Sequence, residues 1–280
     1  MEYQPLRIVI GYDGSRDAAL ALNWAVEAAN RLELPVVAVV AGPGHEGPVP
    51  EGDWDSTRLE EIRAAAEWAL SDAAAVDGSA VVRRGPVAQT LLEAAEGAAL
   101  LVVGSRGHGP LNSLVMGSVS QAVARRAGCP VVVVRPSETP APSRIVVGVD
   151  GSLGCRAALE FACSRAELTG EPVVALYARK LPKFFVDAQG RVPPVLVARL
   201  DDEERLAQEA ADDLRKKYPD VDLRSHTVKV AAAQGLVDAS LTASLVVVGS
   251  RGQGAVPGML LGSVSQAVLH RALCPVAVAR

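Results

Sequence analysis

The fold is decided by the stretch from Leu100 to Val134, which reads LLVVGSRGHGPLNSLVMGSVSQAVARRAGCPVVVV. Its first four residues form a short apolar run, typical of a strand that is buried on both faces. A glycine-rich turn, Gly104 to Gly109, follows. After Gly117-Ser118 the pattern predicts a helix with hydroxyl residues near its N-terminus. This helix should end at Gly128-Cys129-Pro130, before four valines form another buried strand.

The order of strand, glycine turn and helix start is typical of an anion site. The first backbone N–H groups of a helix lack partners within the helix and carry partial positive charge, so a phosphate can bind there. Glycines let the phosphate approach the backbone because no Cβ lies in the way. A single loop of this kind would also be explained as an ordinary tight turn.

The same stretch occurs twice, which weakens the explanation as a tight turn. Residues 245–276 repeat it, and both copies keep the spacing Gly-x2-Gly-x9-Gly-Ser. The residues that carry this spacing are Gly104, Gly107, Gly117 and Ser118 in the first copy and Gly249, Gly252, Gly262 and Ser263 in the second. The repetition extends upstream, since the strand and turn of residues 7–15 recur at 144–152.

Composition excludes several classes of protein. The chain has 280 residues, of which 49% are hydrophobic and 21% charged, as in an ordinary globular protein. The net charge of −4 and the lack of a basic stripe argue against nucleic-acid binding. Neither a signal peptide nor an apolar run of the ~20 residues that span a bilayer is found, so we expect no membrane contact. Four cysteines without Cys-x-x-Cys spacing are interpreted as small buried hydrophobes, which predicts a cytoplasmic protein.

Each half follows the pattern β-α-β-α-β-α-β-α-β. This pattern predicts an α/β fold with a five-stranded parallel sheet and helices on both faces. We expect helices over 16–32, 56–76 and 87–95, with counterparts over 156–168, 201–218 and 236–243. Because a polar, proline-rich stretch is typical of a domain boundary, we predict two tandem domains, 1–136 and 144–280, joined by a linker over 137–143.

An open parallel sheet binds ligands at the carboxyl ends of its strands. Asp13 and Asp150 follow the first strand of each half, so they should lie at the same edge as the glycine loops. The chain has no Gly-x4-Gly-Lys-[Ser/Thr] motif, and its first strand is not followed by Gly-x-Gly-x-x-Gly. The sequence therefore supports neither a Walker NTPase nor a dinucleotide enzyme.

With these motifs, essentially the whole chain resembles the universal stress protein family in its tandem two-domain form. The spacing Gly-x2-Gly-x9-Gly-[Ser/Thr] is similar to the ATP-binding pattern of the family's nucleotide-binding branch, and both halves meet it in full. The resemblance implies a Rossmann-like fold of the adenine nucleotide alpha hydrolase type, with ATP as the ligand. It further implies that the motif residues hold the phosphates and ribose, that Asp13 and Asp150 border the nucleotide, and that Ala41 and Ala178 meet adenine.

The residues predicted to contact the nucleotide come from the strand ends, glycine loops and helix starts of both halves. They are Gly11, Asp13, Ala41, Gly104, Ser105, Arg106, Gly107, Gly117, Ser118, Val119, Ser120, Gly148, Asp150, Ala178, Gly249, Ser250, Arg251, Gly252, Gly262, Ser263, Val264 and Ser265.

Some residues near the loops allow two interpretations. Arg106 and Arg251 either meet phosphate charge or are solvated turn residues. His108 is replaced by Gln253 in the second copy, so we do not assign it a catalytic role. Phe184-Phe185, in the loop that is longer in the second half, is either a partner contact or a local hydrophobic clasp.

The function expected from the resemblance is that of a non-enzymatic, ATP-binding regulator of stress or dormancy responses. The alternatives are a slow ATPase or adenylate-handling enzyme on the same fold, and a purely structural dimerisation module. No paired general acid and base recurs beside both loops. One carboxylate per site, Asp13 or Asp150, is a small ligand set for Mg²⁺. The sequence does not identify a protein partner.

The final strand of each half, residues 131–134 and 276–279, should lie at a sheet edge. An exposed apolar edge strand tends to pair with another strand. The linker can span roughly 30 Å when extended, so the two strands can reach each other. We therefore expect them to pair antiparallel as a pseudo-dimer within the chain, and a homodimer of whole chains is left open.

Overall fold

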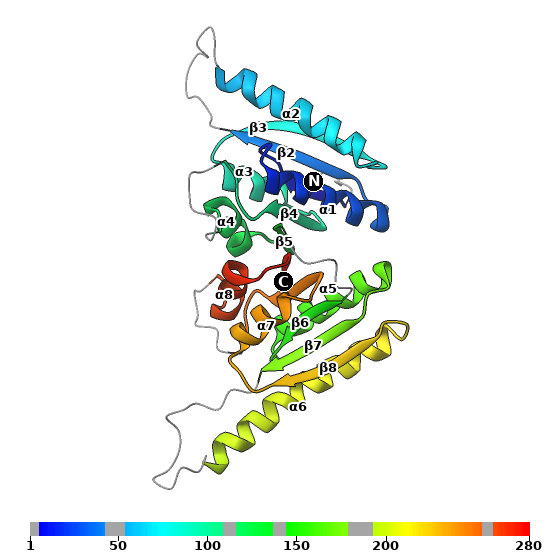
Figure 1. The fold of residues 1–280 in the computed structure, drawn as a ribbon, viewed down its shortest axis with the longest axis vertical. Helices are drawn as coiled ribbons and strands as arrows, with labels where there is room; N and C mark the ends of the chain where they lie inside the picture. Colours follow the sequence, from blue (N-terminus) through cyan, green and yellow to red (C-terminus); the bar gives the residue numbers. More distant parts are fainter. Residues whose placement is uncertain (1–5, 43–53, 109–115, 137–143, 179–192, 254–259) are drawn as a thin grey trace. The chain divides into compact units, whose positions relative to one another are not determined.

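The computed structural model describes residues 6–42, 54–108, 116–136, 144–178, 193–253 and 260–280. The chain divides into two compact units, residues 1–136 and 137–280 (Figure 1). Within the described residues, each unit contains five strands and four helices. Phe184-Phe185, interpreted either as a partner contact or as a local hydrophobic clasp, lie outside the described part of the chain.

In the first unit the strands lie in the order β3-β2-β1-β4-β5, and every neighbouring pair is parallel. The elements in chain order are β1 (Ile8–Gly11), α1 (Arg16–Leu32), β2 (Val36–Gly42), α2 (Trp54–Asp72), β3 (Gly78–Arg84), α3 (Val87–Ala94), β4 (Leu100–Gly104), α4 (Ser118–Arg126) and β5 (Val131–Val134).

The second unit repeats this order as β8-β7-β6-β9-β10, again with parallel neighbours. Its elements are β6 (Ile145–Val149), α5 (Leu153–Thr169), β7 (Val173–Ala178), α6 (Pro194–Lys217), β8 (Leu223–Val228), α7 (Ala232–Ser240), β9 (Leu245–Gly249), α8 (Ser263–Arg271) and β10 (Val276–Ala279).

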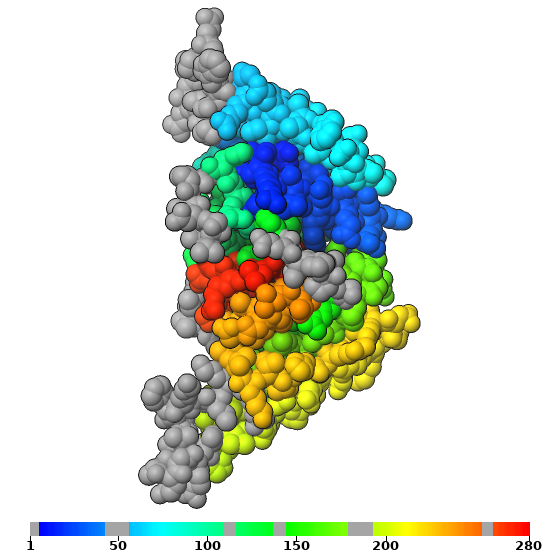
Figure 2. All heavy atoms as spheres, viewed as in Figure 1, coloured from blue at the N-terminus to red at the C-terminus, as the bar shows by residue number. Residues whose placement is uncertain are grey.

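Helices cover both faces of the strands in each unit. In the first unit α1 contacts α2, and α3 contacts α4; in the second, α5 contacts α6, and α7 contacts α8 (Figure 1). Strands β4 and β5 are buried along their whole length, as expected where helices lie on both faces. Figure 2 shows α2 in light blue and α6 in yellow-green at the surface of their own units. The predicted α/β fold of two tandem parallel five-stranded domains is confirmed.

A serine side chain caps the N-terminus of the first helix in each unit. The Ser15 hydroxyl accepts a hydrogen bond from the Ala18 amide at 3.2 Å, and the Ser152 hydroxyl accepts one from the Cys155 amide at 3.2 Å. Each hydroxyl thereby satisfies one of the N–H groups that a helix start leaves without a partner. These caps fix the point at which the chain leaves its first strand and enters the helix.

The three helices predicted by range in the second unit all begin earlier than expected, and α5 does so by three residues, at Leu153 rather than at residue 156. Helix α6 begins at Pro194 rather than at residue 201, because proline fits the first turn, where its missing N–H is not needed. Helix α7 begins at Ala232 rather than at residue 236, and it accommodates Gly235 in its interior. In α6 and α7 the residues that the prediction left out include a proline or a glycine, residue types that usually interrupt helices.

The four cysteines are buried thiols and form no disulfide: Cys129, Cys155, Cys163 and Cys274. Burial raises the pKa of Cys163 to about 11, so this thiol stays protonated at neutral pH. Among the helices that the structure describes, none combines the length and apolar character that crossing a membrane requires.

We expect Ser152→Ala to lower the melting temperature by about 3 °C, because losing an N-cap costs about 1 kcal/mol. Ser164→Ala is the matched control in the same helix. It replaces a mid-helix serine by the best helix former, so it should leave the melting temperature unchanged or slightly raised. Thermal unfolding followed by circular dichroism measures both variants, and equal shifts for the two would show that the cap adds nothing.

Candidate functional site

A cavity lies at the carboxyl ends of the central strands in each unit. The first has a volume of about 600 Å³ and is lined by every residue predicted for that half except Ser105. The second has a volume of about 400 Å³ and is lined by every residue predicted for its half except Ser250. The structure therefore brings the strand ends, glycine loops and helix starts of each half together around one space.

One wall of each cavity is apolar. Val39, Leu91 and Val103 line the first cavity, from β2, α3 and β4. Their counterparts in the second are Leu176, Leu236 and Val248. The sequence did not identify these residues as part of the site, because an apolar residue that lines a cavity has the same periodicity as one in the core. An apolar wall of this kind suits the face of an aromatic ring.

The glycines Gly11 and Gly148 are explained by packing on this wall. A Cβ added to Gly11 would lie 2.9 Å from Leu91 Cδ1, and one added to Gly148 would lie 2.9 Å from Leu236 Cδ1. The two positions shape the cavity through the leucines that press against them.

Each cavity is also lined by a helix start without a side-chain cap. Helix α4 begins after Gly117 and α8 begins after Gly262, and neither glycine can supply a capping oxygen. The glycine amides themselves donate to the loop carbonyls of Ser105, at 2.9 Å, and Ser250, at 2.8 Å. The N–H groups of the next residues have no earlier turn to bond to, and these residues line the cavity. An anion placed here would meet unpaired donors and the positive end of the helix dipole.

The serines of these helix starts divide into two kinds. The hydroxyls of Ser120 and Ser265 donate to the carbonyl oxygens of Gly104 and Gly249, both at 2.6 Å, so they tie the helix to the strand end. Ser118 and Ser263 are exposed and come first in their helices. Of the two kinds, the exposed pair has hydroxyl groups available to a ligand.

Among the motif glycines, Gly104 and Gly249 are required by close backbone packing. A Cβ on Gly104 would lie 2.7 Å from the carbonyl carbon of Asp17, and one on Gly249 would lie 2.5 Å from the carbonyl oxygen of Gly154. The first helix of each unit therefore begins directly against the end of the fourth strand, and no side chain fits between them.

Gly107 and Gly252 are explained by the acidic residue after the first strand. A Cβ at either position would overlap the Oδ2 atom of Asp13 or Asp150. The other carboxylate oxygen accepts the amide of Ser15 at 2.9 Å in the first unit, and the same bond forms to Ser152 in the second at 3.0 Å. Each carboxylate is thus held between the turn and the glycine loop.

Gly117 and Gly262 differ from the other motif glycines because no contact within the described part of the chain requires a glycine there. Both have extended backbone angles, φ −64° and −70°, that any residue adopts. Among the described residues, the atom nearest to an added Cβ is the Ser105 carbonyl oxygen at 3.4 Å for Gly117, and the Ser250 carbonyl oxygen at 3.6 Å for Gly262. Both contacts are of ordinary length, so a Cβ at these positions would displace no atom of the described residues.

His108 and Gln253 occupy equivalent positions, and each side chain contacts the carbonyl oxygen of the aspartate after the first strand. His108 Nε2 lies 2.9 Å from the Asp13 carbonyl oxygen, and Gln253 Nε2 donates to the Asp150 carbonyl oxygen at 2.5 Å. Since an amide can replace the imidazole here, the contact requires a hydrogen bond and no proton transfer.

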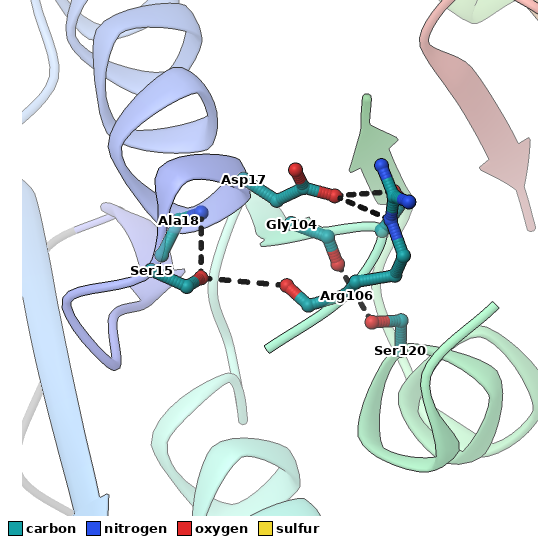
Figure 3. A network of polar contacts seen from close by, with 7 residues as sticks. Ser15, Asp17, Ala18, Gly104, Arg106 and Ser120 are labelled. Carbon is teal, nitrogen blue, oxygen red and sulfur yellow. Dashed lines mark hydrogen bonds and ion pairs between the residues drawn. The ribbon is translucent and has the colours of Figure 1, made fainter. Parts of the chain in front are cut away.

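A buried acidic residue that the sequence analysis did not single out lies beside the first glycine loop. Figure 3 shows Asp17 pointing from the first turn of α1 towards Arg106. The Asp17 carboxylate accepts hydrogen bonds from Ser105 Oγ at 2.6 Å and from Arg106 Nε at 3.2 Å. Only 8% of its side chain is exposed, against 34% for Arg106. No motif marks Asp17, so its role is visible only in three dimensions.

A family model described as Universal stress protein family matches residues 6–135 and again residues 142–280. The chain belongs to the universal stress protein family. Universal stress protein Rv2005c of Mycobacterium tuberculosis is 36% identical over 98% of this chain and 96% of its own length. A universal stress protein of Mycolicibacterium smegmatis is 32% identical with the same coverage. A universal stress protein of Archaeoglobus fulgidus, covering 99% of both chains at 19% identity, shares the fold with a TM-score of 0.72.

The ionisable groups of this universal stress protein offer little for metal binding. Within the described ranges, no three His, Cys, Asp or Glu side chains come together as a metal site. Beside the first cavity, burial and then the charge of Asp13 raise the pKa of Tyr12, so its phenol stays neutral. Each cavity has one carboxylate after its first strand, Asp13 or Asp150, and part of its hydrogen-bonding capacity is taken by the backbone. The first cavity also contains Asp17, whose carboxylate is bonded to Ser105 and Arg106.

We expect Gly104→Ser and Gly117→Ser to have opposite effects on stability. At Gly104 the new Cβ collides with the backbone of α1, which should lower the melting temperature by about 5 °C. At Gly117 the side chain has room, and serine is a favourable N-cap, so the melting temperature should be retained or rise. Thermal melts of nucleotide-free protein compare the two. A large loss at Gly117 would show that the fold itself requires this glycine.

Proposed function

We propose that each unit binds one adenine nucleotide and that occupancy regulates a stress or dormancy response. We propose ATP as this nucleotide because the glycine motif of the chain resembles that of the family's nucleotide-binding branch. The observation that carries the proposal is the pair Gly117 and Gly262. Neither the backbone geometry nor the packing of the described residues requires a glycine at these positions, and each lines a cavity next to an uncapped helix start. Space reserved for a phosphate explains both features at once.

Each cavity combines an apolar wall with an uncapped helix start, which suit the base and the phosphates of a nucleotide. The apolar wall around Leu91 or Leu236 offers a surface for the adenine ring, and the uncapped start of α4 or α8 offers donors for phosphate. Ala41 and Ala178, at or near the ends of the second strands, line the cavities where the family pattern has adenine meet the backbone. Volumes of about 600 and 400 Å³ lie in the range of small-molecule sites.

We propose binding rather than turnover as the function. The side chains nearest the glycine loops are engaged in structural bonds: Asp13 with the Ser15 amide and His108 with the Asp13 carbonyl group. Their equivalents in the second unit do the same, and the replacement of His108 by Gln253 leaves no shared base. Bound Mg²⁺ would have Asp13 or Asp150 as its protein carboxylate and would otherwise rest on phosphate oxygens and water.

We expect calorimetric titration of nucleotide-stripped protein with ATP to give two sites per chain. Gly117→Val and Gly262→Val should each remove one site, because the β-branched side chain occupies the space of the phosphate. Each variant should remain folded by circular dichroism, with a loss of about 1 kcal/mol from the poorer N-cap.

The matched control is Ser79→Val, which places the same side chain on an exposed position of β3, away from the cavity. It should keep both sites. Two sites in the folded double variant Gly117→Val/Gly262→Val would show that the glycine loops are turns and nothing more.

We expect ATP hydrolysis slower than about 1 s⁻¹, below the usual range of enzymes. Release of phosphate by purified protein measures the rate, and the double variant Gly117→Val/Gly262→Val gives the background. A faster rate that disappears in the double variant would favour the ATPase interpretation over the regulator.

A further inference from the structure

The two cavities differ by one buried charge. The second residue of α1, two places after the capping Ser15, is Asp17, and the second residue of α5, two places after the capping Ser152, is Gly154. Asp17 forms an ion pair with Arg106 of the first glycine loop (Figure 3). The first cavity therefore has an arginine whose charge is already balanced by a carboxylate.

The second cavity has the arginine without the acid. Arg251 stands at the loop position of Arg106 and lines the cavity. Its side chain makes no ion pair or hydrogen bond with any residue in the described part of the chain. A side chain on Gly154 would overlap the Arg251 carbonyl oxygen, so the close backbone contact itself keeps an acid out of this position.

A second charge difference, the exposed Arg16, would favour phosphate binding in the first cavity instead. Arg16 lines the first cavity, and Leu153 replaces it in α5. Arg16 is exposed, and water and salt screen an exposed charge. Asp17 is buried, where charges act on one another more strongly. The carboxylate should therefore dominate the difference between the two sites.

We infer that Asp17 makes the two nucleotide sites unequal: the second site selects nucleotides by their phosphate charge more strongly than the first. This inference rests on the proposed nucleotide binding. Phosphates in the first site meet an arginine neutralised by Asp17, together with the negative charge of Asp17 itself. Phosphates in the second site meet Arg251, an exposed arginine that has no equivalent of the buried Asp17. The Asp150 carboxylate of the second cavity is matched by Asp13 in the first, so it does not distinguish the sites. The second site is a triphosphate site. The first site loses less affinity when the nucleotide has fewer phosphates.

The test measures each site of the full chain separately. Gly262→Val leaves the first site, and Gly117→Val leaves the second. In each background, ATP and AMP are titrated calorimetrically, and the ratio of Kd for AMP to Kd for ATP is taken. We expect this ratio to be about tenfold larger at the second site.

Two pairs of variants identify the cause. Asp17→Asn removes the charge while its amide oxygen can still accept the Ser105 hydroxyl, so it should raise the ratio at the first site about tenfold. Arg251→Gln should lower the ratio at the second site about tenfold, and Arg106→Gln should lower it at the first by less than about threefold. Melting temperatures confirm that each variant is folded.

The outcomes separate this inference from the proposed function. If both sites bind and their ratios are equal, the inference alone is wrong. If Asp17→Asn weakens ATP binding at the first site, Asp17 holds Arg106 in place for phosphate, and the inference is wrong in sign. If the parent chain binds neither ATP nor AMP, the proposed function fails and the inference fails with it.

Discussion

Each unit depends on one close contact between two stretches of backbone. The start of α1 lies against the end of β4 at Gly104, and the start of α5 lies against the end of β9 at Gly249. This contact sets the turn after the first strand beside the glycine loop, so that Asp13 or Asp150 can be held between them. Without it, the residues that line each cavity would belong to separate parts of the sheet edge.

The sequence spacing was sufficient to locate the glycine loops and the starts of α4 and α8, because glycine and serine recur there at the same intervals in both halves. It could not tell the glycines apart. Gly104 is required by packing against α1, whereas Gly117 has room for a side chain, and the two look alike in a motif. The difference depends on atoms distant in sequence, which a single chain read alone does not reveal.

The apolar wall and Asp17 could not be predicted from the sequence, because their residue types are common at such positions in any helix. Leu91 and Leu236 form an apolar wall, but their short helices have the periodicity of any helix that packs on a core. Asp17 sits in the first turn of a helix, where an acidic residue is common for its favourable interaction with the helix dipole. Nothing in that position indicates an ion pair with Arg106, which is far away along the chain.

The two kinds of helix start have a consequence for the lifetime of the protein. The Ser15 hydroxyl caps α1, whereas Gly117 supplies no capping oxygen and leaves N–H donors at the start of α4 for a ligand. A ligand that binds there recognises only the folded state, because the unfolded chain has no helix start. At a hundred times its Kd such a ligand adds about 2.7 kcal/mol to the free energy of unfolding. Resistance to unfolding and to proteolysis would then rise and fall with the concentration of that ligand in the cell.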